Sequence, residues 1–64
     1  MNRIEIKAKI ADLNLVTKIV MSNCHVLSKL TESNKELNGI IEDTLRKVEI
    51  VQSEIKELTE MVDK

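Results

Sequence analysis

Cys24 and His25 are the residues of this sequence whose chemistry is most distinctive, and they are its only cysteine and its only histidine. A structural zinc site needs four ligands, and neighbouring helical residues point about 100° apart, so this pair could not readily share one ion. A single cysteine also cannot form an internal disulfide. We therefore expect no metal and no cofactor, with Cys24 packed as a small apolar side chain and His25 in solvent.

The carboxylates and lysines offer no clearer site. A helix surface has no cleft that would desolvate a pair of carboxylates, so the acidic residues of the second half are expected to form a solvated surface. Lys7, Lys18 and Lys29 are spaced eleven apart and have no aromatic residues between them. The sequence has no nucleophile beside a base and no glycine-rich phosphate loop. We expect a protein that is not an enzyme.

The composition favours association of several chains. The chain has 64 residues, which is enough for one domain (residues 1–64) but buries too little surface for a secure monomer. It has no Phe, Tyr or Trp to fill a core. Its 10 basic and 11 acidic residues give a net charge of −1, which argues against nucleic-acid binding.

The chain carries no visible targeting segment. Its first residues, Met-Asn-Arg-Ile-Glu-Ile, contain no cationic stretch leading into an apolar run. The most apolar window, residues 10–27, contains Asp12, Lys18 and His25 and is too polar to span a bilayer. An intracellular, cytoplasmic protein is the default expectation, and a lone reduced cysteine agrees with it.

A heptad repeat organises the elements that carry these residues. From Leu37 to Val62 aliphatic or small residues recur in alternating steps of four and three, which is the spacing of a coiled-coil seam. The same frame extends back to Ile6 without a slip. The predicted oligomer interface consists of Ile6, Leu13, Val16, Val20, Leu27, Leu30, Leu37, Ile41, Val48, Val51, Ile55, Leu58 and Val62.

The fold class is all-α, and two architectures fit the repeat. The unbroken frame favours one long helix of about 90 Å, forming a coiled-coil or helical-bundle oligomer. The alternative is a helical hairpin with a turn near residues 31–39, which would dimerise to a four-helix bundle. Ser33 and Glu36 have the spacing of a capping box, and Asn38-Gly39 adds a weak turn signal. Helices near residues 3–30 and 34–63 would result.

The apolar stripe is wider than a two-stranded seam. Positions beside the seam, which carry Glu and Lys in typical dimers, are here often apolar. These predicted interface flanks are Ile19, Cys24, Val26, Ile40 and Leu45. More than two packed helices are therefore expected, as a tetramer of long helices or a dimer of hairpins.

The orientation of the helices stays open, because two signals disagree. Residues 1–30 hold five basic and two acidic side chains, whereas residues 31–64 hold five basic and nine acidic ones, so antiparallel pairing joins opposite charges. Asn23 and Asn34 lie in the seam, where a parallel arrangement would pair each amide with its own copy and specify the register.

These observations predict a non-catalytic self-assembly module that brings copies of itself or attached partners together. The alternative is a small helical adaptor or regulatory subunit whose wide apolar stripe receives helices of another protein. The expected partners are further copies of the chain and another protein, with no nucleic acid and no membrane span.

Overall fold

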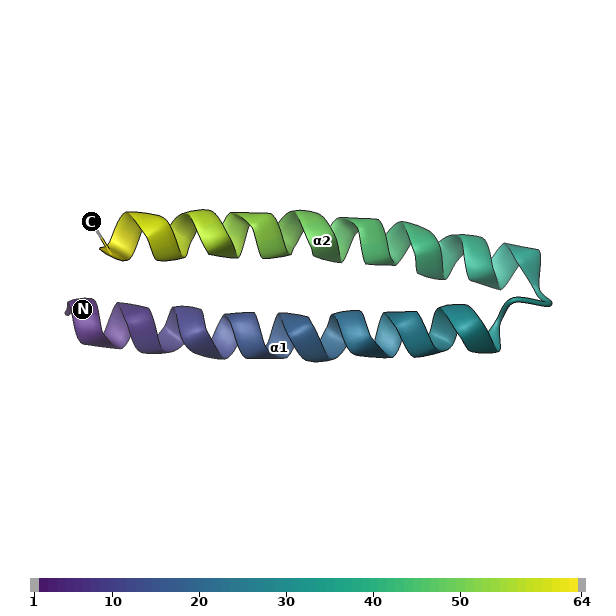
Figure 1. The fold of residues 1–64 in the computed structure, drawn as a ribbon, viewed down its shortest axis with the longest axis horizontal. Helices are drawn as coiled ribbons and strands as arrows, with labels where there is room; N and C mark the ends of the chain where they lie inside the picture. The colour runs from purple at the N-terminus through teal and green to yellow at the C-terminus, as the bar shows by residue number, and fades with distance from the viewer. Residues whose placement is uncertain (1, 64) are drawn as a thin grey trace.

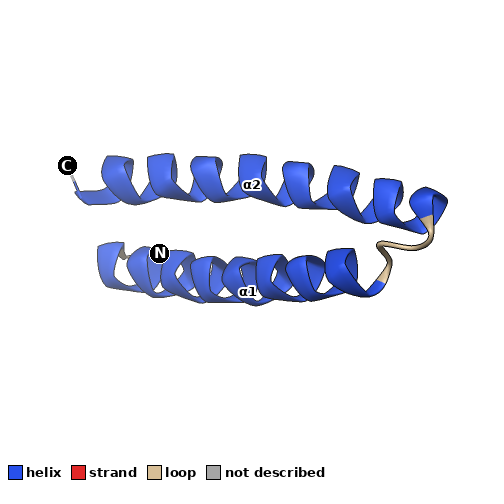
Figure 2. Ribbon diagram, turned by 45° about the vertical axis from the view of Figure 1, so that its right-hand side comes forward, coloured by secondary structure: helices blue, strands red, loops and turns tan. Residues whose placement is uncertain are grey.

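The chain folds into two antiparallel helices joined by a short turn (Figure 1). The computed structural model describes residues 2–63, with α1 at Arg3–Leu30 and α2 at Lys35–Asp63. Within these residues every element is helical, and a loop separates the two arms (Figure 2). The expectation of one continuous helix is therefore wrong, and the helical hairpin of the alternative is confirmed, with its turn at residues 31–34. The hairpin is 48 Å long and only 15 Å by 13 Å across.

Side chains cap both ends of α1. The Glu5 N–H donates to Asn2 Oδ1 at 2.8 Å, and Asn2 Nδ2 donates back to Glu5 Oε1 at 3.3 Å. This reciprocal pair satisfies an otherwise free N–H of the first turn. At the other end, the Thr31 N–H and the Thr31 hydroxyl both donate to the Leu27 carbonyl, at 3.0 and 2.7 Å. The helix ends there because Thr31 leaves helical geometry, at φ −107° and ψ 15°.

Asn34 starts α2 and explains why the heptad frame does not produce one helix. The Leu37 N–H donates to Asn34 Oδ1 at 3.1 Å, while the Asn38 N–H donates to the Asn34 carbonyl at 2.9 Å. The N-cap is therefore Asn34, and the predicted capping box of Ser33 and Glu36 does not form, because the residue three positions after Asn34 is Leu37. Gly39 lies inside α2 and does not form a turn. Local hydrogen bonds of weak helix formers thus interrupt an otherwise continuous apolar pattern.

Contacts between α1 and α2 hold the turn closed. Asn38 Nδ2 donates to the Ser28 carbonyl at 2.8 Å and to Thr31 Oγ1 at 3.3 Å. The Ser28 hydroxyl donates to Glu42 Oε1 at 2.6 Å. The bond from Asn38 occupies the Ser28 carbonyl in the last turn of α1, where intrahelical partners run out.

The two helices pair in one constant register. The residue numbers of contacting pairs add up to 69 or 70 at both ends of the hairpin. These pairs are Thr31–Asn38 and Ser28–Glu42 beside the turn, and Lys7 Nζ with Asp63 Oδ1, 2.9 Å apart, at the open end. In α1 the contact stripe runs through Ile10, Asn14, Thr17, Met21, Cys24 and Ser28. In α2 it runs through Ile41, Leu45, Val48, Gln52, Ile55 and Val62.

The interior between the helices is thin. Among the described residues only Cys24, Leu45, Ile55 and Thr17 are buried, at 3–7 % exposure. The Thr17 hydroxyl donates to the Leu13 carbonyl at 2.7 Å, so its burial leaves no free donor. Small polar side chains on α1 contribute little hydrophobic stabilisation, because the hydrophobic free energy comes from apolar surface area removed from water. Two helices by themselves therefore make a weakly stabilised unit.

We expect Asn34→Ala to lower the free energy of unfolding by about 1 kcal/mol, because the first turn of α2 loses its side-chain acceptor. Chemical denaturation followed by circular dichroism at one fixed chain concentration measures the change. Ser33→Ala is the matched control, and we expect its effect to stay within about 0.5 kcal/mol. The reverse order of the two effects would contradict Asn34 as the cap.

Candidate functional site

Most of the predicted interface residues lie on one exposed side of the hairpin. We define the apolar face as Leu13, Val16, Val20, Leu27 and Leu30 of α1 together with Leu37, Val51 and Leu58 of α2. Their exposed fractions range from 39 % for Val20 to 73 % for Leu30. An apolar surface of this extent is unusual for a small monomer and is typical of a surface that contacts another molecule.

The remaining predicted interface residues pack between α1 and α2. Ile55 is buried, and Ile6, Ile41, Val48 and Val62 are half-buried. The predicted flanks separate into two groups. Cys24 and Leu45 lie at the centre of the contact between the helices, whereas Ile19, Val26 and Ile40 are more than half exposed. The chain thus uses one part of its wide stripe inside the hairpin and leaves another part in solvent.

A groove between the helices runs along the apolar face. It is lined by Val16, Thr17 and Val20 of α1 and by Val48 and Val51 of α2, and its volume is about 190 Å³. Nearly all of its surface is aliphatic, because the Thr17 hydroxyl is already hydrogen-bonded to the backbone. Such a groove receives aliphatic side chains of a packed helix rather than a polar ligand.

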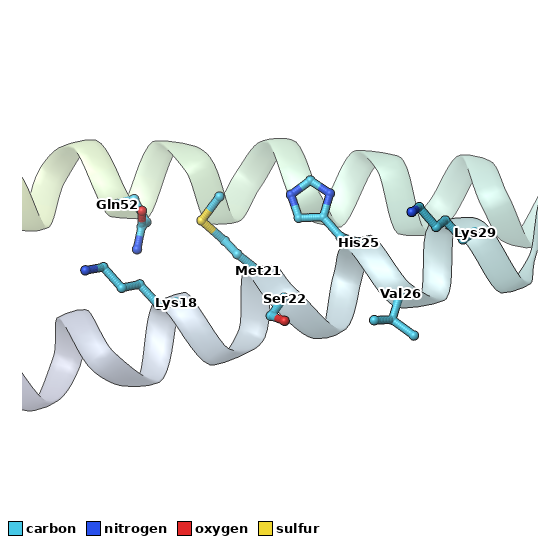
Figure 3. A pocket seen from close by; sticks show the side chains of 7 residues that line it. All are labelled: Lys18, Met21, Ser22, His25, Val26, Lys29 and Gln52. Atoms are coloured by element: carbon cyan, nitrogen blue, oxygen red, sulfur yellow. The ribbon is translucent and has the colours of Figure 1, made fainter.

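The opposite side of the hairpin carries basic and polar side chains together with Met21 and Val26. Figure 3 shows a shallow depression where Lys18, His25 and Lys29 of α1 lie along one side and Gln52 of α2 lies opposite Lys18. The side chains are spread along the helix and do not converge on a point. Two of the three lysines spaced eleven apart, Lys18 and Lys29, lie on this surface, which contains no enclosed volume in which a ligand would be desolvated.

Cys24 and His25 face different surroundings, as adjacent helical positions require. Cys24 is a free, buried thiol between the helices, whereas His25 is exposed on the polar side. In residues 2–63 no group of three or more His, Cys, Asp or Glu side chains is placed to hold a metal ion. Neither described helix has a stretch long and apolar enough to cross a bilayer.

The two predicted register residues have different roles. Asn23 is exposed on the same side as Val16, Val20 and Leu27, within the apolar face. Asn34 caps α2 in the turn. The heptad frame did not predict that Asn14, Thr17 and Gln52 lie between the helices, because polar residues are not expected in a core. The available signal on α1 was the spacing of three, four and three residues from Asn14 through Thr17 and Met21 to Cys24.

The charges on α2 interact mainly within the helix. Lys47 Nζ lies 3.0 Å from Asp43 Oδ2, and Arg46 Nη2 lies 3.9 Å from Asp43 Oδ1. The hydrogen bond and positive charge of Lys47 lower the pKa of the Asp43 carboxyl below its usual 3.8, and Arg46 adds to this effect. All three side chains are exposed, so these pairs support the helix and create no reactive group.

The comparisons with known proteins add no relative: no protein-family model, no curated protein and no solved structure matches this chain. Functional inference therefore depends on the geometry of the hairpin itself.

Gln52 offers a test of the contact between α1 and α2. Its Nε2 is buried without a hydrogen-bond partner. Because a buried donor without a partner is costly, we expect Gln52→Leu to raise the free energy of unfolding by about 1–3 kcal/mol. Chemical denaturation at a fixed chain concentration measures it. Ser53→Leu, at the exposed neighbouring position, should change stability by less than about 0.5 kcal/mol. Equal effects of the two substitutions would contradict this assignment.

Proposed function

We propose that this chain is a non-catalytic self-assembly module whose apolar face packs against a second copy of the hairpin, forming a four-helix bundle. The observation that carries the proposal is the apolar face, whose eight aliphatic side chains are exposed and, by helical periodicity, extend from the groove of Val16, Val20 and Val51. A helix pair with a second apolar stripe reaches a stable state by covering that stripe with further helices. Nothing else on the described surface gathers groups that would perform chemistry.

The exposed area supports a second hairpin as the occupant. A compact monomer of 7.3 kDa is expected to expose about 4200 Å². This hairpin exposes 5173 Å². The excess of about 1000 Å² is close to the ~800 Å² that each partner buries in a standard protein interface. A second hairpin also matches the 48 Å length of the face.

Assembly would also supply the stability that the hairpin lacks. Only three apolar side chains are buried among the described residues. Fully burying one Val or Leu side chain contributes roughly 1.5–3 kcal/mol, and each copy brings eight such side chains that are about half exposed. Folding and dimerisation are therefore expected to be coupled, so that the free chain is much less helical than the dimer.

The main alternative is an adaptor whose apolar face receives helices of a different protein. The purified chain separates the two. A chain that is helical, cooperative and dimeric alone supports self-assembly. A chain that stays monomeric and largely unfolded at high micromolar concentration would contradict self-assembly and favour the adaptor.

Val16→Asp tests the face directly. Val16 lies in the apolar groove, where a carboxylate would be desolvated on packing. We expect the variant to lose the dimer, with a dissociation constant raised at least 100-fold, as measured by sedimentation equilibrium or light scattering over a range of chain concentrations.

Leu15→Asp is the matched control. Leu15 is the neighbouring aliphatic residue, and its exposed fraction of 60 % is close to the 56 % of Val16. It points about 100° away from Val16 around the helix, outside the apolar face. Both variants place the same charge in the same part of α1, so their helix propensities are comparable. Equal loss of the dimer in both variants would argue against the apolar face as the interface.

A further inference from the structure

We propose that the second hairpin packs with its turn at the same end as the first, so that α1 of one copy lies against α2 of the other. This inference rests on the proposed self-assembly and adds the orientation of the partner. A symmetric pair of hairpins has two arrangements. With the turns at the same end, α1 contacts α2 of the second copy. With the turns at opposite ends, α1 contacts α1 and α2 contacts α2.

The register of the hairpin determines which residues meet in each arrangement. Facing residues of α1 and α2 have numbers that add up to 69 or 70. A two-fold axis parallel to the helices keeps every residue at its height, so the same rule holds between α1 and α2 of the second copy. In the opposite-end arrangement each height is inverted, and the residues beside the turn meet the residues at the open end.

Polar residues match when the turns lie at the same end. Asn23 of α1 then faces Thr44 of the second copy, within one helical turn of the register. Both side chains are exposed in the hairpin. The Thr44 hydroxyl donates to the Ile40 carbonyl in its own helix, and its oxygen is free to accept from the Asn23 amide across the interface. Inverting one copy places Asn23 near Val16 instead, which leaves the amide against an aliphatic side chain.

The residues beside the turn match in the same way. Leu30 then faces Ile40 of the second copy, and Leu37 of the second copy lies within one helical turn of Leu30, as Ile40 does of Leu27. These four side chains are 45–73 % exposed in the single hairpin. In the inverted arrangement Leu30 faces Lys9, a charged residue at the open end. The aliphatic cluster at the turn is therefore covered completely only when a second turn lies beside it.

The net charges of the helices favour the same choice. Arg3–Leu30 carries five basic and two acidic residues, whereas Lys35–Asp63 carries four basic and eight acidic ones. Neighbouring helices are about 10 Å apart, which is close to the screening length at physiological salt. The same-end arrangement places each basic helix between two acidic ones. The opposite-end arrangement places basic beside basic and acidic beside acidic.

One pair favours the opposite arrangement. With the turns at opposite ends, Lys47 would lie near Glu54 of the second copy, whereas the same-end arrangement places Lys47 beside Asn23 and Glu54 beside Val16 of the second copy's α1. Both residues are exposed, so such a pair is screened by water and salt and contributes little. Lys47 is also already paired with Asp43 in its own helix. The Asn23–Thr44 contact and the aliphatic cluster at the turn therefore outweigh the Lys47–Glu54 pair.

Distances between spin labels in the assembled protein test the orientation. Ser33→Cys places a label in the turn, and Ala8→Cys places one on the exposed side of α1 near the open end. Both are made with Cys24→Ala, so that each chain carries one label. For same-end packing, Ser33–Ser33 and Ala8–Ala8 distances fall well below the 48 Å length of the hairpin. A mixture of the two labelled chains adds a distance close to that length.

The inverted result, with long distances in each single variant and a short one in the mixture, would overturn the proposed orientation while leaving self-assembly intact. A monomeric mass would instead contradict the proposed function itself, so the two failures are distinguishable.

Lysine cross-linking of the unaltered chain provides a second measurement in case Cys24→Ala does not fold. Mixing isotope-labelled and unlabelled copies identifies links between chains. Same-end packing predicts links between the Lys9 side chains of the two copies, because both open ends then lie together. Links between Lys35 and Lys9 of different copies would overturn it.

Discussion

A pair of helices can bury only one stripe on each helix, and this constraint determines which apolar residues of the chain stay exposed. The aliphatic residues here cover more than one stripe. When α1 and α2 pack through the line that includes Cys24, Leu45 and Ile55, the line through Val16, Val20 and Val51 is left in solvent. The surplus is large in proportion to the interior, because only three apolar side chains are buried in the described hairpin. Assembly is the physical remedy available to so small a chain.

The turn shows how local chemistry overrides a long-range pattern. The heptad frame passes through residues 31–34 without interruption. Even so, the Leu37 N–H donates to Asn34 Oδ1, and the Thr31 hydroxyl donates to the Leu27 carbonyl. Each bond stabilises by about 1 kcal/mol, which is comparable with the gain from continuing a helix through weak helix formers. Closing the hairpin then adds the contacts of the whole interior, which a continuous helix would have to obtain from another chain.

The division of the surface into an apolar and a polar side connects the fold to its proposed role. Lys18, His25 and Lys29 lie on the side away from the groove of Val16 and Val20. A bundle of two hairpins would therefore bury the aliphatic side and keep the charged one in water. The asymmetric order of polar and apolar residues along the apolar face is what makes one orientation of the second copy better than the other.

The sequence by itself determined that the chain is helical, that its helices carry a stripe too wide for two strands, and that a break near residues 31–39 was available. These features follow from spacing and local capping chemistry, which neighbouring residues decide. Only the tertiary structure decided that the break is used, that Asn34 rather than Ser33 is the cap, and that Thr17, Cys24 and Gln52 lie inside while Leu30 and Leu37 stay outside. The reason is that a wide stripe offers several pairings of similar polarity, and the choice among them depends on how closely two particular surfaces fit.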